Sequence, residues 1–309
     1  MILVDFSNIS YRCLFSAIKD IPNASKSSEY GGLMLHQMLE YFNTIQKDFS
    51  ATYGNEIILC LDSPVTWRGQ LYPEYKKSRK KDSKIDWEDF FSFRDEFLQD
   101  MLCLPYKQAF TPLAEADDII YVLSKHAKEK VLIISEDKDF LQLKSDKIDI
   151  YRPIAKCFLE VPPKGIGWAL AYHICLGDKV DNIPSIKEYT IPTPEYSAFL
   201  QDENNKDKEF DGVKWKPGRF GEKSAAEFTD NLLSNLRGNP AMYQRFLQNR
   251  ALIDMKKLPK LMEERILETP LQGNYDADKM DLFYQKYNLR KISATMHLAK
   301  SYDFIGWNI

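Results

Sequence analysis

The sequence lacks the features that would assign it to a membrane, secreted or zinc-binding class. None of its apolar runs approaches about 18 residues, and the N-terminus enters MILVDFSNI without a basic region or a signal core. Its five cysteines never form a C-x-x-C pair, and its four histidines show no metal-ligand spacing. We therefore expect a soluble, cytoplasmic protein with no membrane partner, no disulfide framework and no zinc site.

The overall charge conceals an uneven distribution along the chain. The 309 residues are 44% apolar and 28% charged, with a formal net charge of −3, which is typical of a globular protein. Between Arg68 and Lys84, however, seven basic residues accompany two acids. A protein with a slightly negative mean charge therefore carries one strongly basic stretch.

Three short apolar runs end in acidic residues, at 2–5 (ILVD), 56–62 (EIILCLD) and 131–137 (VLIISED). Segments with helical periodicity occur at 33–49, 87–102 and 114–127. Buried runs that alternate with amphipathic helices predict an α/β fold with a central, mostly parallel sheet flanked by helices.

The pattern turns helical at about residue 162 and stays so to the C-terminus, except at 184–217. That interval contains four prolines and little periodicity, so we expect a long loop or insertion there. The predicted organisation is one domain at 1–182 and a helical portion at 183–309 that contains the insertion.

The acids are expected to meet at one edge of the sheet. Ligands of open parallel sheets bind beyond the carboxyl ends of the strands, where Asp5, Asp62 and Asp137 occur. Carboxylate oxygens suit Mg²⁺, with Mn²⁺ as a substitute, and so many acids suit two ions. The candidate metal ligands are Asp5, Asp62, Glu115, Asp117, Asp118, Asp137, Asp139, Asp178 and Asp181.

The spacing of these acids along the chain supports a shared metal site for some of them more than for others. Glu115 and Asp118 are three residues apart and share a helix face, whereas Asp117 joins them only at an irregular first turn. Asp178 and Asp181 flank a turn opened by Gly177. Any one of the acids alone is equally a surface, cap or turn residue, so the joint placement carries the prediction.

The basic stretch WRGQLYPEYKKSRKK combines cations with Trp67, Tyr72 and Tyr75. Cations bind phosphates and aromatic faces stack on unpaired bases, so this mixture suits single-stranded nucleic acid. A solvated loop without a ligand is the alternative. The position directly after Asp62 favours binding, because a phosphate chain held there would reach the acids.

Six motifs in order resemble the 5′ nuclease or flap endonuclease family, and its bacteriophage members in particular: ILVDFSN, ILCLD, YKKSR, EADD, ISEDKDF and GDKVDNIP. The resemblance covers most of residues 1–250. It implies a metal-dependent 5′ to 3′ exonuclease and flap endonuclease with ribonuclease H activity, which removes RNA primers and adjoining DNA during lagging-strand replication. Residues 1–182 would be the nuclease domain, with a basic arch at about 63–95.

The resemblance also implies roles for single residues. Asp5, Asp62, Glu115, Asp117 and Asp137 would surround one ion and Asp139, Asp178 and Asp181 a second, while Asp118 matches an acid that only some members have. Lys76 and Arg79 would stabilise the scissile phosphate and, with Asp137, form the catalytic set. Tyr75 would stack near the terminal nucleotide, and the remaining arch contacts would be Arg68, Lys77, Lys80 and Lys81.

The family grips duplex DNA with a helix-turn-helix element that often binds potassium. The nearest match here is PGRFGEKSAAEF at 217–228, where Gly218, Gly221, Lys223 and Ser224 would contact phosphate. Its glycine spacing departs from the family pattern, which leaves K⁺ binding open, and a plain helix cap is the alternative.

The expected partners are DNA and RNA–DNA duplexes with 5′ ends or flaps, bound by a monomer. The C-terminal YDFIGWNI is expected to pack on the body, with binding to a replication protein such as a single-strand-binding protein as the alternative. Two other functions are compatible with parts of the pattern, namely a PIN-like ribonuclease and a non-catalytic DNA-binding protein.

Overall fold

The structure is a computed structural model, and its described part is residues 1–309 without 22, 78, 80–81, 188–219, 238 and 290–309. The chain divides into two compact units. We call the first, Met1–Gln70, Lys80–Val161 and Leu258–Ile309, the sheet unit. The second, Leu71–Arg79 and Pro162–Lys257, is the helical unit.

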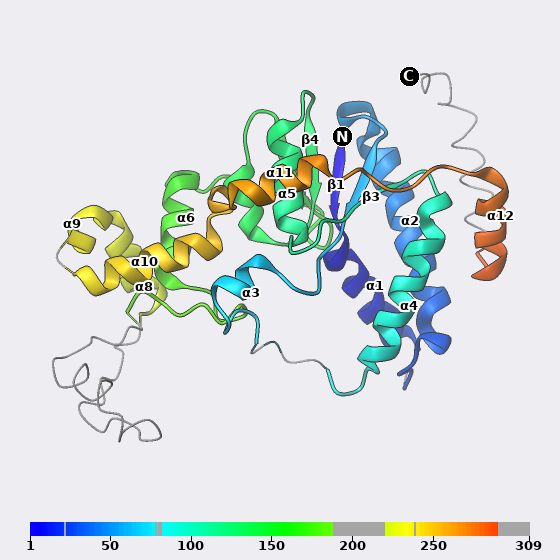
Figure 1. The fold of residues 1–309 in the computed structure, drawn as a ribbon, viewed down its shortest axis with the longest axis horizontal. Helices are drawn as coiled ribbons and strands as arrows, with labels where there is room; N and C mark the ends of the chain where they lie inside the picture. The colour runs from blue at the N-terminus through cyan, green and yellow to red at the C-terminus, as the bar shows by residue number, and fades with distance from the viewer. Residues whose placement is uncertain (22, 78, 80–81, 188–219, 238, 290–309) are drawn as a thin grey trace. The chain divides into compact units, whose positions relative to one another are not determined.

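The sheet unit contains a six-stranded sheet in the order β3-β2-β1-β4-β5-β6. The first five strands in this order pair in parallel, and β6 pairs antiparallel to β5 at one edge. Figure 1 labels β1, β3 and β4 of this sheet. The strands are β1 Ile2–Asp5, β2 Ile57–Cys60, β3 Lys107–Ala109, β4 Val131–Ile134, β5 Ile148–Arg152 and β6 Cys157–Phe158. The predicted α/β class with a mostly parallel sheet is confirmed.

The central strand β1 is buried along its whole length, which explains its unbroken apolar sequence. Val4 lies beside Leu59 of β2 and Ile134 of β4. Because the three strands run in the same direction, the acids that follow them emerge at one edge of the sheet.

Helices cover the two faces of this sheet. On one face, aromatic side chains such as Phe6, Phe42 and Phe97 pack into one core with β1, β2 and β4. On the other face, α5 packs against β1 and β2, and α11 packs against α5. The helices of this unit are α1 Phe6–Asp20, α2 Ser27–Tyr53, α3 Trp67–Leu71, α4 Trp87–Asp100, α5 Ala116–His126, α11 Lys260–Glu268 and α12 Ala277–Lys286.

Three strands were not predicted. β3 is only three residues long and polar at its start, and β6 is only two residues long and exposed. β5 alternates apolar and polar residues in IDIYR and lies toward the edge of the sheet. None of these segments has the continuous apolar run by which the central strands were recognised.

The helical unit has a separate, smaller core. Its described helices are α6 Gly165–Leu176, α8 Glu222–Asp230, α9 Leu232–Arg237, α10 Pro240–Ile253 and the short 3-10 helix η4 Met255–Lys257. Ile174, Phe220 and Phe246 are buried in this core. Tyr72 and Tyr75 of the basic stretch pack against it, which explains why residues 71–79 belong to this unit.

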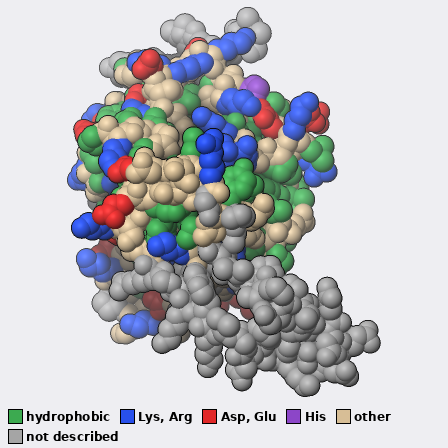
Figure 2. Space-filling view, turned by 90° about the vertical axis from the view of Figure 1, so that its left-hand side faces the viewer, with side chains coloured by type: hydrophobic (Ala, Val, Ile, Leu, Met, Phe, Trp, Pro, Cys, Tyr) green, Lys and Arg blue, Asp and Glu red, His purple; other side chains and the backbone are tan. Residues whose placement is uncertain are grey.

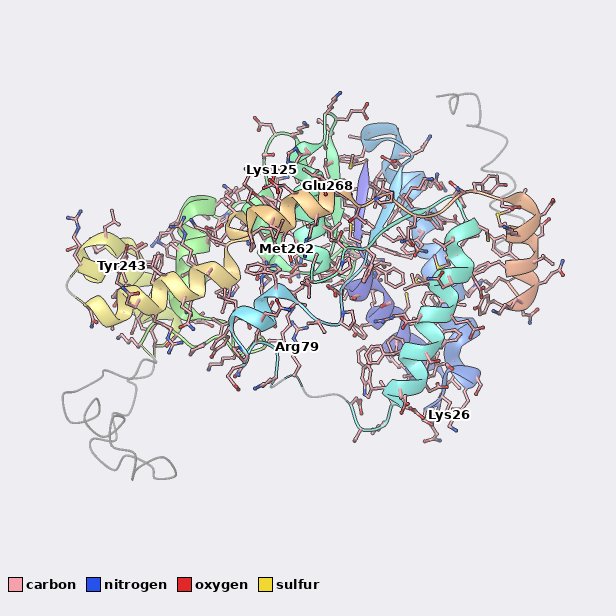
Figure 3. The ribbon with its side chains drawn as sticks, in the orientation of Figure 1. Lys26, Arg79, Lys125, Tyr243, Met262 and Glu268 are labelled. Atoms are coloured by element: carbon pink, nitrogen blue, oxygen red, sulfur yellow. The ribbon has the colours of Figure 1, made fainter. Side chains whose placement is uncertain are left out.

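The observed division differs from the predicted boundary at 182/183. The helical unit begins at Pro162, and the chain returns to the sheet unit at Leu258. Met262 of α11, labelled in Figure 3, and Ile266 are buried, and Phe283 of α12 joins the sheet core. Helical periodicity predicts that a helix has a buried face, but it does not predict which unit packs against that face. The sequence therefore does not predict that the chain re-enters the sheet unit at Leu258.

Most of the predicted insertion at 184–217, together with the C-terminal YDFIGWNI, lies outside the described residues. Over the part of the chain that is described, none of the helices combines the length and apolarity of a membrane span.

Candidate active site

Asp5 ends β1 and begins α1. Its carboxylate caps that helix by accepting a hydrogen bond from the Asn8 amide at 3.2 Å. The residue is 8% exposed. The last residue of the central strand therefore holds a nearly buried carboxylate at the carboxyl edge of the sheet.

Ser135 connects Asp5 to the next acidic segment. It is fully buried, and its hydroxyl donates to Asp5 Oδ2 at 2.8 Å while accepting from the Asp137 amide at 3.0 Å. Asp137 in turn accepts from the Asp139 amide at 2.8 Å and caps the 3-10 helix Lys138–Leu143. The pattern of acids does not predict the role of Ser135, for which a polar residue directly after an apolar strand is the available signal.

The first turn of α5 approaches the end of β2. Asp62, which follows β2, accepts a 2.8 Å hydrogen bond from the Ala116 amide. Asp117 lies on the same turn, and its charge adds to burial and to the charges of Asp5 and Asp62 in raising the pKa of the Cys60 thiol. Asp117 thus lies near Asp5 and Asp62 from the capped first turn of α5, and its predicted place beside Glu115 and Asp118 stays a prediction.

The pKa of Asp5 depends on its burial and on the acids around it. Burial raises the pKa of Asp5 to about 7, and the carboxylates of Asp62 and Asp137 contribute to this rise against two opposing hydrogen bonds. The charges of Asp62 and Asp137, which follow β2 and β4, thus act on the carboxyl group of Asp5 at the end of β1. Such a set of oxygen donors fits a divalent cation, because a bound cation removes the repulsion.

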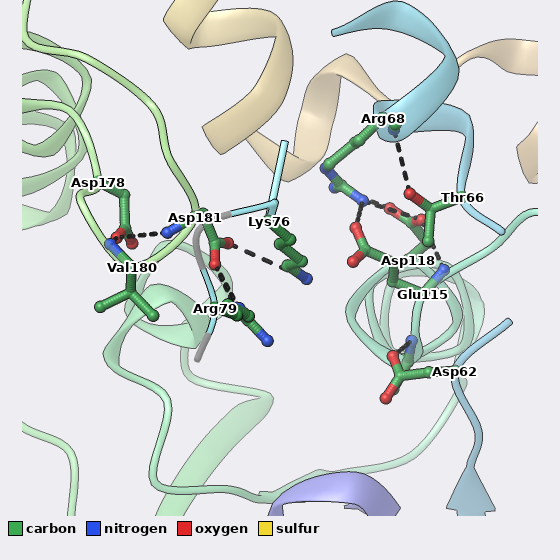
Figure 4. Close-up of polar contacts among 12 residues, drawn as sticks. Asp62, Thr66, Arg68, Lys76, Arg79, Glu115, Asp118, Asp178, Val180 and Asp181 are labelled. Carbon is green, nitrogen blue, oxygen red and sulfur yellow. Dashed lines mark hydrogen bonds and ion pairs between the residues drawn. The ribbon is translucent and has the colours of Figure 1, made fainter. Parts of the chain in front are cut away.

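Glu115 and Asp118 occupy a different environment. They form a reciprocal capping box at the start of α5 and are 2% and 0% exposed. Arg68 pairs with both, at 2.8 Å from Glu115 Oε2 and 2.8 Å from Asp118 Oδ1 (Figure 4). Trp67 Nε1 also donates to Asp118 at 2.9 Å. Asp118 Oδ1 is thus paired with Arg68 by charge, without a hydrogen bond, and its Oδ2 accepts from Trp67.

The position of Arg68 argues against the predicted contact with nucleic acid. Its side chain is 3% exposed, and its guanidinium lies between two buried carboxylates. Leaving them for a phosphate would strand two buried charges. Arg68 therefore differs from the exposed cations that follow it.

In the helical unit, Gly177 ends α6 and turns the chain into the Asp178–Asp181 segment. Its φ is +73°, a conformation that favours glycine. Asp178 accepts from the Val180 amide at 2.7 Å and the Asp181 amide at 3.2 Å. A hydrogen bond from His173 lowers the pKa of Asp178, so this acid is held in its charged form.

Lys76 and Arg79 meet Asp181 within this unit. Arg79 Nε donates to Asp181 Oδ1 at 3.1 Å, and Lys76 Nζ lies 4.0 Å from Oδ2 (Figure 4). The Lys76 amide also donates to the Asp181 carbonyl oxygen at 2.9 Å. Two predicted catalytic cations are therefore attached to a predicted metal ligand.

The other predicted nucleic-acid contacts are partly described. Tyr75 is half-buried, with Lys76 Nζ 4.8 Å from its ring centroid, and Lys77 is exposed beside Glu74. Gly221 caps α8, whose first turn carries Lys223 and Ser224. Lys and Arg side chains lie at several places on the face in Figure 2, among apolar and acidic ones. Lys80, Lys81 and Gly218 lie outside the described residues.

Residues 1–165 match the family model described as "5′-3′ exonuclease, N-terminal resolvase-like domain". Among curated proteins, the ribonuclease H of Enterobacteria phage T4 is 30% identical over 195 residues, which are 60% of this chain and 62% of that protein. A 5′-3′ exonuclease of Buchnera aphidicola is 30% identical over 174 residues, 52% of this chain and 57% of that one. The matched region thus spans about three fifths of these relatives.

The fold is also that of solved phage nucleases. The T5 5′-exonuclease with bound zinc superposes with a TM-score of 0.56 at 16% identity, over 95% of this chain and 99% of that one. The T5 flap endonuclease, solved as a pseudo-enzyme–product complex with DNA and metal ions, gives 0.53 at 16% identity, over 95% and 98%. At this identity the likeness shows a shared fold.

Proposed function

Because the chain belongs to the 5′-3′ exonuclease family, we propose that it is a metal-dependent 5′ to 3′ exonuclease and flap endonuclease. Its substrates would be DNA and RNA–DNA duplexes with 5′ ends or flaps. Its role would be the removal of RNA primers and adjoining DNA during lagging-strand replication. The T4 relative named ribonuclease H supports the RNA part of this proposal.

The observation that carries the proposal is the crowding of carboxylates around Asp5, whose pKa burial and Asp62 raise to about 7. A protein that only binds DNA has no use for mutually repelling acids facing a polyanion. Two bound divalent ions would supply an activated water and stabilise the leaving oxygen of a phosphodiester. We propose Mg²⁺ as the ion, with Asp5, Asp62, Asp117 and Asp137 as its principal ligands.

The remaining acids take different parts in this proposal. Glu115 remains a proposed ligand beside its pairing with Arg68, whereas Asp118 is left out because Arg68 pairs with its Oδ1 and Trp67 donates to its Oδ2. Asp139 on the 3-10 helix remains a proposed ligand. Asp178 and Asp181 of the helical unit are proposed for a second ion.

The basic residues would act on the phosphate. Lys76 and Arg79 both pair with the Asp181 carboxylate. A scissile phosphate would therefore have to replace this carboxylate as the partner of the two cations. Arg79 is 51% exposed, which leaves its guanidinium accessible to a substrate. Charge from both side chains would then stabilise the phosphate as negative charge develops on it.

A magnesium titration on three substrates tests the proposal: a 5′-flap, an RNA-primed duplex and single-stranded RNA. We expect Mg²⁺-dependent cutting of the first two near their 5′ ends. Cutting of single-stranded RNA alone would instead indicate a PIN-like ribonuclease, and binding without cutting a non-catalytic DNA-binding protein. The matched control is Asp137→Asn, which should bind the flap normally and not cut it.

A further inference from the structure

Arg68 is the centre of a buried polar cluster beside the proposed metal ligands. The side chains of Arg68, Glu115 and Asp118 are 3%, 3% and 0% exposed. Arg68 Nη1 lies 2.8 Å from Glu115 Oε2 and 3.0 Å from Asp118 Oδ2, and Nη2 lies 2.8 Å from Asp118 Oδ1. Its guanidinium also lies 4.6 Å from the Trp67 ring centroid. Its orientation is therefore fixed from several sides.

The cluster holds the first turn of α5. The Glu115 amide donates to Asp118 Oδ2 at 3.0 Å, and the capping box returns a bond from the Asp118 amide to Glu115. Within this turn, the Ala116 amide binds Asp62. Any shift of the turn would therefore move Asp62 and Asp117 together.

We propose that Arg68 is a positioning residue for the metal centre, because its planar fork fixes Glu115 and Asp118 and so sets the first turn of α5 against Asp62. The inference rests on the proposed function and adds a residue to it. Lysine cannot replace this role fully, since an ammonium group cannot bind two carboxylates with a rigid fork. Partners that orient metal ligands typically change metal affinity by about 10–100-fold when they are removed.

A purely stabilising role is the competing explanation. A buried ion pair often contributes little compared with apolar residues of the same volume, but removing one partner alone strands a buried charge. The test therefore compares R68M/D118N with D118N, so that the Asp118 charge is absent from both proteins and Glu115 is the one acid whose pairing with Arg68 differs between them. In both, the amide oxygen introduced by D118N can still accept from Trp67 or from the Glu115 amide.

Calorimetric titration with Mn²⁺, without nucleic acid, is the primary measurement. We expect R68M/D118N to bind Mn²⁺ about 10–100-fold more weakly than D118N. We also expect R68K to bind about tenfold more weakly than the wild type, with flap cleavage recovering at high Mn²⁺. The control R94K alters an arginine of α4 that pairs with Asp95, and it should bind Mn²⁺ as the wild type does.

Equal Mn²⁺ affinity in R68M/D118N and D118N would overturn the inference, and so would wild-type affinity in R68K. If the double variant does not fold, R68K decides alone, because it keeps a cation between the two acids. Failure of the proposed function looks different. In that case the wild type would bind Mn²⁺ without cutting a flap, and the effect of Arg68 on Mn²⁺ affinity would remain measurable.

Discussion

Ser135 and Asp5 are joined by a 2.8 Å hydrogen bond from the serine hydroxyl to Asp5 Oδ2. The same hydroxyl accepts from the Asp137 amide at 3.0 Å. Because β1 and β4 are neighbouring parallel strands, one buried hydroxyl fixes the acids that follow both strands. The hydroxyl thereby links the carboxylate of Asp5 to the backbone of Asp137, the residue of another proposed metal ligand.

Replacing Ser135 with alanine should weaken metal binding. The change removes a donor to Asp5 and an acceptor for the Asp137 amide, so we expect about tenfold weaker Mn²⁺ binding and a stability loss of about 1–2 kcal/mol. Ser124→Ala is the matched control, because Ser124 is also buried and donates to the Tyr121 carbonyl oxygen. Calorimetry should separate the two variants, and similar Mn²⁺ affinities would contradict this role of Ser135.

The stability of the metal-free protein should depend on the protonation of Asp5. Burial and the Asp62 carboxylate raise the pKa of Asp5 from 3.8 to about 7, so the folded protein binds this proton more tightly than the unfolded chain does. The free energy of unfolding should therefore fall as pH rises from about 4 to about 7, and stay low above that. The expected loss is on the order of 2–4 kcal/mol, as the pKa shift implies.

Asp5→Asn removes this titrating group, so its free energy of unfolding should fall less over the same pH range. Mn²⁺ should stabilise the wild type more at pH 8 than at pH 5, because the protonated carboxyl is a poorer ligand. Urea unfolding at several pH values measures both effects. Parallel pH profiles for the wild type and Asp5→Asn would contradict the raised pKa.

Arg79→Met should slow cleavage without destabilising the fold. Its side chain is 51% exposed in the ion pair with Asp181, so the free energy of unfolding should change by less than about 1 kcal/mol. Loss of a charge that stabilises the phosphate should lower the single-turnover rate by about 10²–10³-fold. Lys260→Met is the control, since Lys260 is 90% exposed and pairs along α11 with Glu264. A wild-type rate in Arg79→Met would remove Arg79 from the catalytic set.

Gly177→Ala should disturb the turn that carries Asp178 and Asp181. An added Cβ would lie 2.4 Å from the Ile183 carbonyl oxygen and 2.5 Å from that of Pro184, at a φ of +73°. We expect a stability loss above about 2 kcal/mol together with weaker cleavage. In Gly167→Ala, on the same helix, the added Cβ meets no atom within 4 Å. That variant should be as stable as the wild type or more stable by about 0.5–1 kcal/mol, as thermal unfolding would show.

The central sheet and the crowded acids could be predicted because their signals are local. Uninterrupted runs such as ILVD mark buried strands, and parallel strands necessarily bring their following acids to one edge. The reciprocal pairing of Glu115 and Asp118 likewise follows from helix geometry. In these places neighbouring residues contain the information that determines the structure.

The rest depends on contacts between distant residues. Arg68 belongs by composition to the basic stretch, and only its burial against α5 separates it from the cations that follow. Helix α11 belongs to the sheet unit, where Met262 is buried. The helical periodicity of the sequence does not specify which unit buries this residue. The pairing of Arg79 with Asp181 spans more than a hundred positions of the chain and has no local signal.

Anomalous diffraction from a crystal soaked in Mn²⁺ tests the central claim most directly, because it locates the ion independently of activity. The account predicts a manganese peak about 2.0–2.4 Å from a carboxylate oxygen of at least one of Asp5, Asp62 and Asp137. The carboxylates of the other two residues should contact the ion directly or through a water molecule. Carboxylates directed away from one another, with no manganese peak among them, would contradict it.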